Sequence, residues 1–244
     1  MNAINKKSIL LILLTIFGLS ANLNAQQKMK TATTLSKTEQ SIIAISALTA
    51  KGDLEKLKSA LHTGLDNGLT INEIKEELTQ LYAYCGFPRS LNGINTFKAV
   101  LDERKAKGIN DIDGKDIEVE NTVADKYEQG RKVLEVLTKT PQAKPAPGYG
   151  EFVPRIDAFL KEHLFADIFA SEVLTYQQRE WITISALASM PGVEPQLKSH
   201  IGLGMNTGIT AEQLKELIGI IETSVGNEAA QSTQRVLDEA LKTN

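Results

Sequence analysis

The chain has 244 residues, with 27 basic and 30 acidic side chains that leave a formal net charge of −3, and it contains one cysteine and three histidines. No block of like charge interrupts the sequence, so neither a nucleic-acid-binding surface nor a polybasic membrane patch is indicated. The single cysteine excludes an internal disulfide, a CxxC redox pair and a zinc site built from several thiolates.

The first predicted element is a signal peptide over residues 1–25. Two lysines precede an apolar run from Ile9 to Leu19, and small and polar residues then lead to Ala25. This order is typical of secretory signal peptides, and the run is shorter than the about 20 residues that span a bilayer. We therefore expect export to the periplasm or the medium after cleavage near Ala25, with no membrane attachment afterwards. An uncleaved anchor is the alternative.

The remaining chain is a duplication. The stretch "LSKTEQSIIAISALTAKG" (35–52) matches "LTYQQREWITISALASMPG" (174–192). Further along, "LKSALHTGLDNGLTINEIKEEL" (57–78) matches "LKSHIGLGMNTGITAEQLKELI" (197–218). Two copies favour a closed pair over a solenoid, which needs about three repeats.

Three parts follow the signal peptide. They are repeat 1 over 26–110, a linker with helices over 111–173, and repeat 2 over 174–244. Within each repeat, a capping-box pattern (36–39 or 175–178) begins a nearly all-apolar helix that we expect to be buried on most sides.

A second helix in each repeat ends at a glycine, and a third begins at Thr70 or Thr210. In repeat 1, Pro88 occupies the first turn of a predicted fourth helix. The linker is expected to carry one helix within 121–138 and one or two within 151–172. The predicted fold is therefore all-α, with two helical repeats packed as one unit.

Four stretches carry a resemblance to a known family. They are "HTGLDNGLTINEIKEELTQLYAYCGFPRSLNG" (62–93), "YEQGRKVLEVL" (127–137), "FADIFASEVLTYQQREWITISAL" (165–187) and "LKSHIGLGMNTGITAEQLKE" (197–216). The chain resembles the carboxymuconolactone decarboxylases, which are relatives of the alkylhydroperoxidase D proteins. The resemblance implies two alkylhydroperoxidase D-like repeats, a homo-oligomer (a trimer acting as a pseudo-hexamer), a small-molecule substrate, and neither metal nor organic cofactor.

Repeat 2 holds the candidate catalytic residues. His200 lies on the same helix face as Leu197, Ile201 and Gly204, so it points inward, and Gly204 would leave space for a pocket beside the imidazole. An inward imidazole can act as a proton donor or acceptor, or it can be a core histidine bonded to the backbone. The family's histidine corresponds to His200.

Two residues of the preceding helix accompany this histidine. Glu180 lies where the thiol-dependent relatives place an acid, and it either orients a proton-transfer partner or stabilises the helix N-terminus. Arg179 is a candidate to bind a substrate carboxylate, or else an exposed surface arginine.

Repeat 1 lacks both catalytic positions, because Ala60 and Ser41 stand where repeat 2 has His200 and Glu180. His62 is displaced around its helix and should face water, and His163 is interpreted as structural or surface.

Repeat 1 instead keeps "YAYCGFPRSLNG" (82–93), which repeat 2 has lost. We expect one composite site per chain. Repeat 2 supplies the catalytic pair. Repeat 1 of the same chain, or of a neighbouring subunit, supplies a wall in which Tyr84, Phe87, Arg89 and Asn92 contact the substrate. For Cys85 we favour packing over pocket lining, and both over a redox thiol or an intersubunit disulfide.

The expected function is cofactor-free proton transfer or decarboxylation on a small lactone or carboxylic acid, as in a carboxy-lyase. A peroxidase of the alkylhydroperoxidase D type is the first alternative, although its CxxC pair is absent here. A non-catalytic ligand-binding or assembly module is the second.

Overall fold

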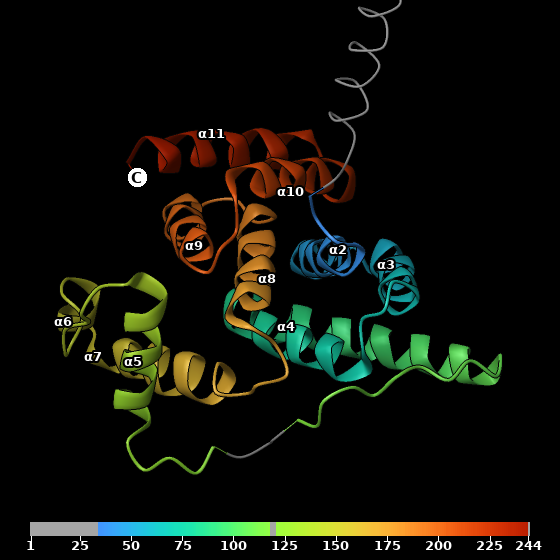
Figure 1. Ribbon diagram of the computed structural model, residues 1–244, viewed down its shortest axis with the longest axis horizontal. Coiled ribbons are helices and arrows are strands. Elements are labelled where there is room, and N and C mark those ends of the chain that lie inside the picture. Colours follow the sequence, from blue (N-terminus) through green and yellow to red (C-terminus); the bar gives the residue numbers. More distant parts are fainter. Residues whose placement is uncertain (1–33, 118–120, 244) are drawn as a thin grey trace, which may run out of the picture. The chain divides into compact units, whose positions relative to one another are not determined.

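The computed structural model describes residues 34–117 and 121–243, and every regular element within them is a helix, as the sequence predicts (Figure 1). The predicted signal peptide, 1–25, lies outside these residues. The helices in chain order are α2 (Lys37–Lys51), α3 (Leu54–Asp66), α4 (Ile71–Ala106), α5 (Lys126–Thr138), α6 (Tyr149–Phe152), α7 (Pro154–Ala158), the π-helix η1 (Phe159–Ile168), α8 (Tyr176–Ala188), α9 (Glu194–Asn206), α10 (Ala211–Ser224) and α11 (Asn227–Thr243). None of these described helices is long and apolar enough to cross a membrane.

The two repeats interlock around a shared core. Their first helices, α2 and α8, pack against each other, and Ile43, Ile45, Ile182 and Ile184 on these helices are fully buried. Helix α4 of repeat 1 packs on α8, and its counterpart α10 of repeat 2 packs on α2. Each repeat therefore covers the first helix of the other, which explains why both first helices are apolar on nearly every face.

Capping boxes set where the helices begin. The hydroxyls of Ser36 and Thr175 each accept a hydrogen bond from a backbone N–H of the first turn. The side chain three residues on, Glu39 or Gln178, accepts a hydrogen bond from the backbone N–H of the cap residue. Thr70 and Thr210 do the same for α4 and α10. Each cap contributes about 1 kcal/mol. The cap at Thr175 places Glu180 in the second turn of α8.

Helix α4 consists of two helical segments joined by a kink at Gly86. This residue has φ 82° and ψ 158°, a backbone conformation that side chains with a Cβ rarely adopt. Pro88 follows in the first turn of the second segment, where its missing N–H is tolerated, as predicted. The Ser90 hydroxyl donates to the Leu78 carbonyl oxygen at 2.7 Å across the kink. The kink places the aromatic residues around Gly86 at the edge of the core.

The linker forms a layer of its own. Helices α5 and η1 pack along each other, and in Figure 1 helices α5 to α7 lie on the opposite side of the molecule from α3. Their shared apolar cluster consists of Leu134, Leu137, Leu164, Phe165, Ile168 and Phe169. Leu203 of α9 and Tyr82 and Tyr84 of α4 pack against this cluster, so the linker covers one end of both repeats.

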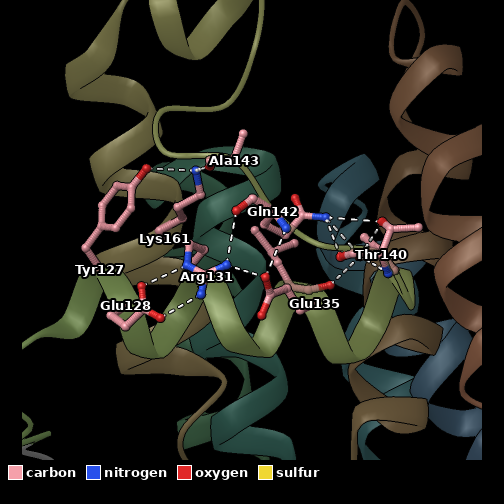
Figure 2. Close-up of polar contacts among 10 residues, drawn as sticks. Tyr127, Glu128, Arg131, Glu135, Thr140, Gln142, Ala143 and Lys161 are labelled. Carbon is pink, nitrogen blue, oxygen red and sulfur yellow. Dashed lines mark hydrogen bonds and ion pairs between the residues drawn. The ribbon is translucent and has the colours of Figure 1, made fainter.

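Ionic contacts fix the loop that follows α5. Figure 2 shows Arg131 between Glu128 and Glu135, with its Nη2 2.6 Å from Oε1 of Glu128. The same guanidinium donates to the carbonyl oxygen of Gln142 at 3.1 Å. The loop is thereby held against the helix that precedes it.

A buried lysine ties the two ends of this layer together. Lys161 is only 1% exposed, and its Nζ donates to Oδ1 of Asp157 at 2.7 Å and to the Tyr127 hydroxyl at 2.9 Å. Burial opposes ionisation of Asp157, but the hydrogen bonds from Lys161 and Tyr127 outweigh it and hold the pKa of this carboxyl below its usual range. The cluster satisfies its own charges and connects η1 to α5 and α7.

Candidate active site

His200 on α9 and Glu180 on α8 lie in direct contact, with Nδ1 2.8 Å from Oε2. Glu180 is fully buried, and the His200 side chain keeps 13% of its surface exposed. An ionised carboxylate only accepts hydrogen bonds, so Nδ1 donates and Nε2 of the neutral ring becomes the proton acceptor. A buried carboxylate that fixes the imidazole tautomer in this way is a known device for making a general base.

Close packing of α9 on α8 makes this contact possible. A Cβ on Gly204 would lie 2.9 Å from Cδ1 of Ile184 and 3.1 Å from Cδ1 of Ile209. The interpretation of Gly204 as a residue that leaves space beside the imidazole is therefore wrong, because the side chains of Ile184 and Ile209 already occupy that space. Gly64 makes the same approach in repeat 1, with Cδ1 of Ile45 at 3.0 Å.

Tyr84 of repeat 1 meets His200 of repeat 2. The two rings are arranged edge to face, with centroids 5.6 Å apart and an interplanar angle of 83°. The Tyr84 hydroxyl is buried, with the Thr183 side chain next to it. Burial and the negative charge of Glu180 raise the pKa of Tyr84 well above its usual value. The phenol therefore stays neutral and keeps its proton at physiological pH.

These rings open onto a cavity of about 1000 Å³. It is lined by both repeats and by the linker, and its walls include Tyr84, Phe87, Leu134, Leu160, His200 and Leu203. The two segments that the composite-site hypothesis joins, the His200 helix and the 82–93 stretch, thus face one cavity. The linker wall was missed by sequence reasoning, since these helices have no copy elsewhere in the chain.

Arg179 does not face this cavity. Its side chain is fully buried, and its guanidinium donates to Oε1 of Gln80 at 2.9 Å, to Oε2 of Glu76 at 3.1 Å and to the carbonyl oxygen of Ser171 at 2.9 Å. Burial lowers the pKa of Arg179, and Glu76 opposes that effect. The alternative of an exposed surface arginine is therefore wrong, and the structure places Arg179 between α8 and α4 instead of in the cavity wall.

The four residues predicted from the 82–93 stretch divide into two pairs. Tyr84 and Phe87 line the cavity. Phe87 is 62% exposed and its ring stacks on Tyr82, with centroids 4.5 Å apart. Arg89 and Asn92 lie beyond the kink, outside the cavity lining.

His163 is a cavity residue that sequence reasoning missed. It lies on η1 and lines the cavity, and its ring is 5.5 Å from that of Tyr82. Its side chain is 51% exposed, in agreement with the surface interpretation, and its Nδ1 lies 3.2 Å from Oδ2 of Asp167. The i,i+4 pairing of His163 with an acid was the available signal. Asp167 also binds Lys126, with Nζ at 2.8 Å.

The equivalent position in repeat 1 holds no such site. Ser41, the counterpart of Glu180, donates to the backbone carbonyl oxygen of Lys37 at 2.9 Å. His62 lies at the surface, partly exposed, with Nε2 3.6 Å from Oε2 of Glu103. Among the described residues of the duplicated helices, only repeat 2 therefore has an imidazole–carboxylate pair that faces the cavity.

Cys85 is half-buried and packs against the shared core, which confirms the packing interpretation. Its thiol donates to the carbonyl oxygen of Leu81 at 3.2 Å. Burial raises the pKa of Cys85 to about 11, so the reactive thiolate is scarce at neutral pH.

Fold and site together define an all-α tandem-repeat protein with a buried carboxylate–histidine pair at the wall of a cavity. The profile of the carboxymuconolactone decarboxylase family matches residues 20–99 and 154–239, which is more than half of the sequence. The chain therefore belongs to the carboxymuconolactone decarboxylase family. It is similar to the 4-carboxymuconolactone decarboxylase of Acinetobacter baylyi, with 25% identity over 118 residues that cover 48% of this chain and 87% of that protein.

Proposed function

We propose that the chain is a cofactor-free enzyme that moves a proton to or from carbon in a small lactone or carboxylic acid, with His200 as the catalytic base and acid. The observation that carries this proposal is the 2.8 Å contact between Nδ1 of His200 and the buried carboxylate of Glu180 at the wall of a large cavity. Membership of the decarboxylase family supports the same class of chemistry.

In the proton-abstraction form of the reaction, Nε2 of His200 removes a proton from a carbon next to a carbonyl group. The C–H electron pair moves into the enolate, and the new positive charge on the ring is stabilised by Glu180. Return of the proton at another carbon completes a rearrangement.

In the decarboxylation form, the bond between the substrate carbon and its carboxylate breaks and carbon dioxide leaves. The electron pair stays on the substrate as an enolate, which protonated His200 then quenches at carbon. The ring regains its proton from solvent. General acid–base catalysis of this kind typically contributes about 10²- to 10⁴-fold to the rate.

Two alternatives are weaker. The dithiol peroxidase mechanism requires two cysteines, and the sequence contains only Cys85. A non-catalytic module would be favoured by a collapsed, side-chain-filled space at His200, whereas a cavity of about 1000 Å³ is present there. We also propose export after cleavage near Ala25 and assembly into a trimer.

A screen in D₂O tests the proposal. The purified protein is incubated with a panel of lactones and carboxylic acids, and deuterium incorporation and carbon dioxide release are measured. We expect turnover of at least one compound, and a loss of about 10²- to 10⁴-fold in His200→Asn. His62→Asn is the matched control and should retain full activity. Unchanged turnover in His200→Asn, with the fold intact by circular dichroism, would contradict the proposal.

A further inference from the structure

The walls of the cavity carry information about the substrate. Most of its lining is apolar, with aromatic and aliphatic side chains from α4, α5, η1 and α9, and the principal polar groups are His163, His200, Ser199, Gln196 and Thr138. No lysine or arginine belongs to the lining among the described residues. Arginine is the side chain best suited to bind carboxylates, because its planar fork makes two parallel hydrogen bonds.

Two buried cations are already paired outside the lining. At the rim, Arg155 lies over the ring of Phe159, with its Cζ 5.3 Å from the ring centroid. Arg179 is bound to Glu76 with Nη2 3.1 Å from Oε2, and Lys161 is bound to Asp157 at 2.7 Å. The lining thus offers a substrate no permanent positive charge from these groups. Separating a buried ion pair leaves an uncompensated charge in the interior, so these cations are not readily released to a ligand.

The charge next to His200 is negative. Glu180 is fully buried behind this ring, and its Oε1 has no hydrogen-bond partner among the described residues. Asp167, behind His163, is paired with Lys126 at 2.8 Å and adds no net charge to this wall. A ligand with two or three carboxylates would lose its hydration in this apolar space and would also meet the charge of Glu180, and both effects disfavour its binding.

The volume of the cavity and its apolar opening also favour a large apolar ligand. A volume of about 1000 Å³ lies at the top of the range of about 300–1,000 Å³ for pockets that take drug-sized ligands. At its rim, Phe87, Tyr149 and Phe159 leave 62%, 52% and 52% of their surface exposed. Apolar side chains exposed around an opening mark an entrance for apolar ligands.

We propose that this cavity binds an uncharged, lactone-type carbonyl compound with a large apolar body, and not a di- or tricarboxylate. This inference rests on the proposed function, in which the carbon next to the carbonyl group must come within reach of Nε2 of His200. Of the two substrate classes named above, it selects the lactone and assigns its apolar part to the wall formed by Phe87, Leu134, Leu160 and Leu203.

Displacement of a neutral fluorescent probe tests the substrate class without knowledge of the natural substrate. N-phenyl-1-naphthylamine is bound to the purified protein, and γ-lactones from four to twelve carbons compete with it, with adipate as the dicarboxylate. We expect affinity to rise about fourfold for each added methylene that becomes buried, and adipate not to displace the probe. Displacement by adipate as strong as by the longest lactone, or no dependence on chain length, would overturn the proposal.

Two tryptophan variants locate the binding, and a third variant tests the missing cation. Leu160→Trp fills the cavity from η1 and should weaken probe binding at least tenfold, whereas Val136→Trp adds the same group on α5 at a side chain that is 62% exposed and outside the lining. Leu203→Arg supplies the missing cation and should allow adipate to compete. Equal probe affinity in the two tryptophan variants, both folded by circular dichroism, would place the probe elsewhere and overturn the proposal.

Light scattering is recorded on the same samples. If probe fluorescence falls as the chain self-associates, the apolar mouth is an interface between copies and the proposal is wrong. The experiments distinguish failure of the proposed function from failure of the ligand class. Tight lactone binding without deuterium exchange would contradict the proposed function and leave the ligand class standing. Deuterium exchange on a polycarboxylate alone would contradict the ligand class and support the proposed function.

Discussion

Nδ1 of His200 lies 2.8 Å from Oε2 of Glu180, although 20 residues and a helix boundary separate them in the chain. The carboxylate is fully buried, so the contact operates in a region of low effective dielectric, where a hydrogen bond to an ionised group is strong. The pair connects the fold to the proposed chemistry, because the packing of α9 on α8 determines which ring nitrogen faces the cavity.

Replacing Glu180 with glutamine should weaken catalysis while leaving the cavity in place. The amide keeps the size of the carboxylate but lacks the negative charge that stabilises the imidazolium. We expect turnover to fall by about 10²- to 10⁴-fold, with probe binding within about twofold of wild type. Steady-state kinetics on a substrate from the D₂O screen, beside probe titration, measure both. Wild-type turnover in Glu180→Gln would show that this acid does not assist His200.

Adding a methyl group at Gly204 should push α9 away from α8. The new Cβ would lie 2.9 Å from Cδ1 of Ile184, and overpacking of this kind costs about 1–3 kcal/mol of unfolding free energy. We expect Gly204→Ala to lose both stability and turnover. Gly64→Ala should lose similar stability and keep turnover, since the same contact in repeat 1 supports no catalytic pair.

Gly202, on the same helix, provides the opposite control. A Cβ there would meet nothing within 4 Å, so Gly202→Ala should raise stability by about 0.5–1 kcal/mol through the better helix propensity of alanine. Urea denaturation of the three variants separates these outcomes. Equal stability of Gly204→Ala and Gly202→Ala would contradict the packing role of Gly204.

Glu77 should make stability depend on pH. It is 1% exposed, and burial raises its pKa well above the usual value, although the Ser46 hydroxyl donates to it at 2.7 Å. Above about pH 4.5 the unfolded chain releases this proton while the folded chain retains it, so stability falls as pH rises until the folded pKa is reached. Glu77→Gln should remove that slope and stabilise the protein by about 1–3 kcal/mol at pH 8. Denaturation between pH 5 and 8 measures the slope, and the exposed Glu162→Gln serves as control.

Cys85 should react slowly with alkylating reagents. Because its pKa is about 11, the folded protein holds about a hundredfold less thiolate at neutral pH than a free cysteine does. We expect iodoacetamide to modify Cys85 slowly at pH 7.5 and rapidly after unfolding, and Cys85→Ala to retain turnover. Rapid modification of the folded chain would contradict the packing role.

The fold could be predicted because capping patterns and buried periodicity recur in both copies of the duplication. The same patterns, with the family resemblance, put His200 and Glu180 on inward faces of neighbouring helices, and the structure brings the two side chains together at 2.8 Å. The burial of Arg179 could not be predicted, because its partner Glu76 is 103 residues away on another helix. His163 was missed because the linker has no second copy for comparison. Arg89 and Asn92 follow the Gly86 kink, as the cavity residue Phe87 does, and yet lie outside the lining.

The protonation of the His200 ring tests the central claim most directly. Two-bond ¹H–¹⁵N correlation spectra of the imidazole nitrogens, assigned with His62→Asn, His163→Asn and His200→Asn, show which nitrogen of each neutral ring carries the proton. We expect the proton on Nδ1 of His200, bound to Glu180, with Nε2 bare and ready to accept a proton from the ligand. A proton on Nε2 in the neutral ring would contradict the account, because the cavity would then face a donor where the proposed reaction needs a base.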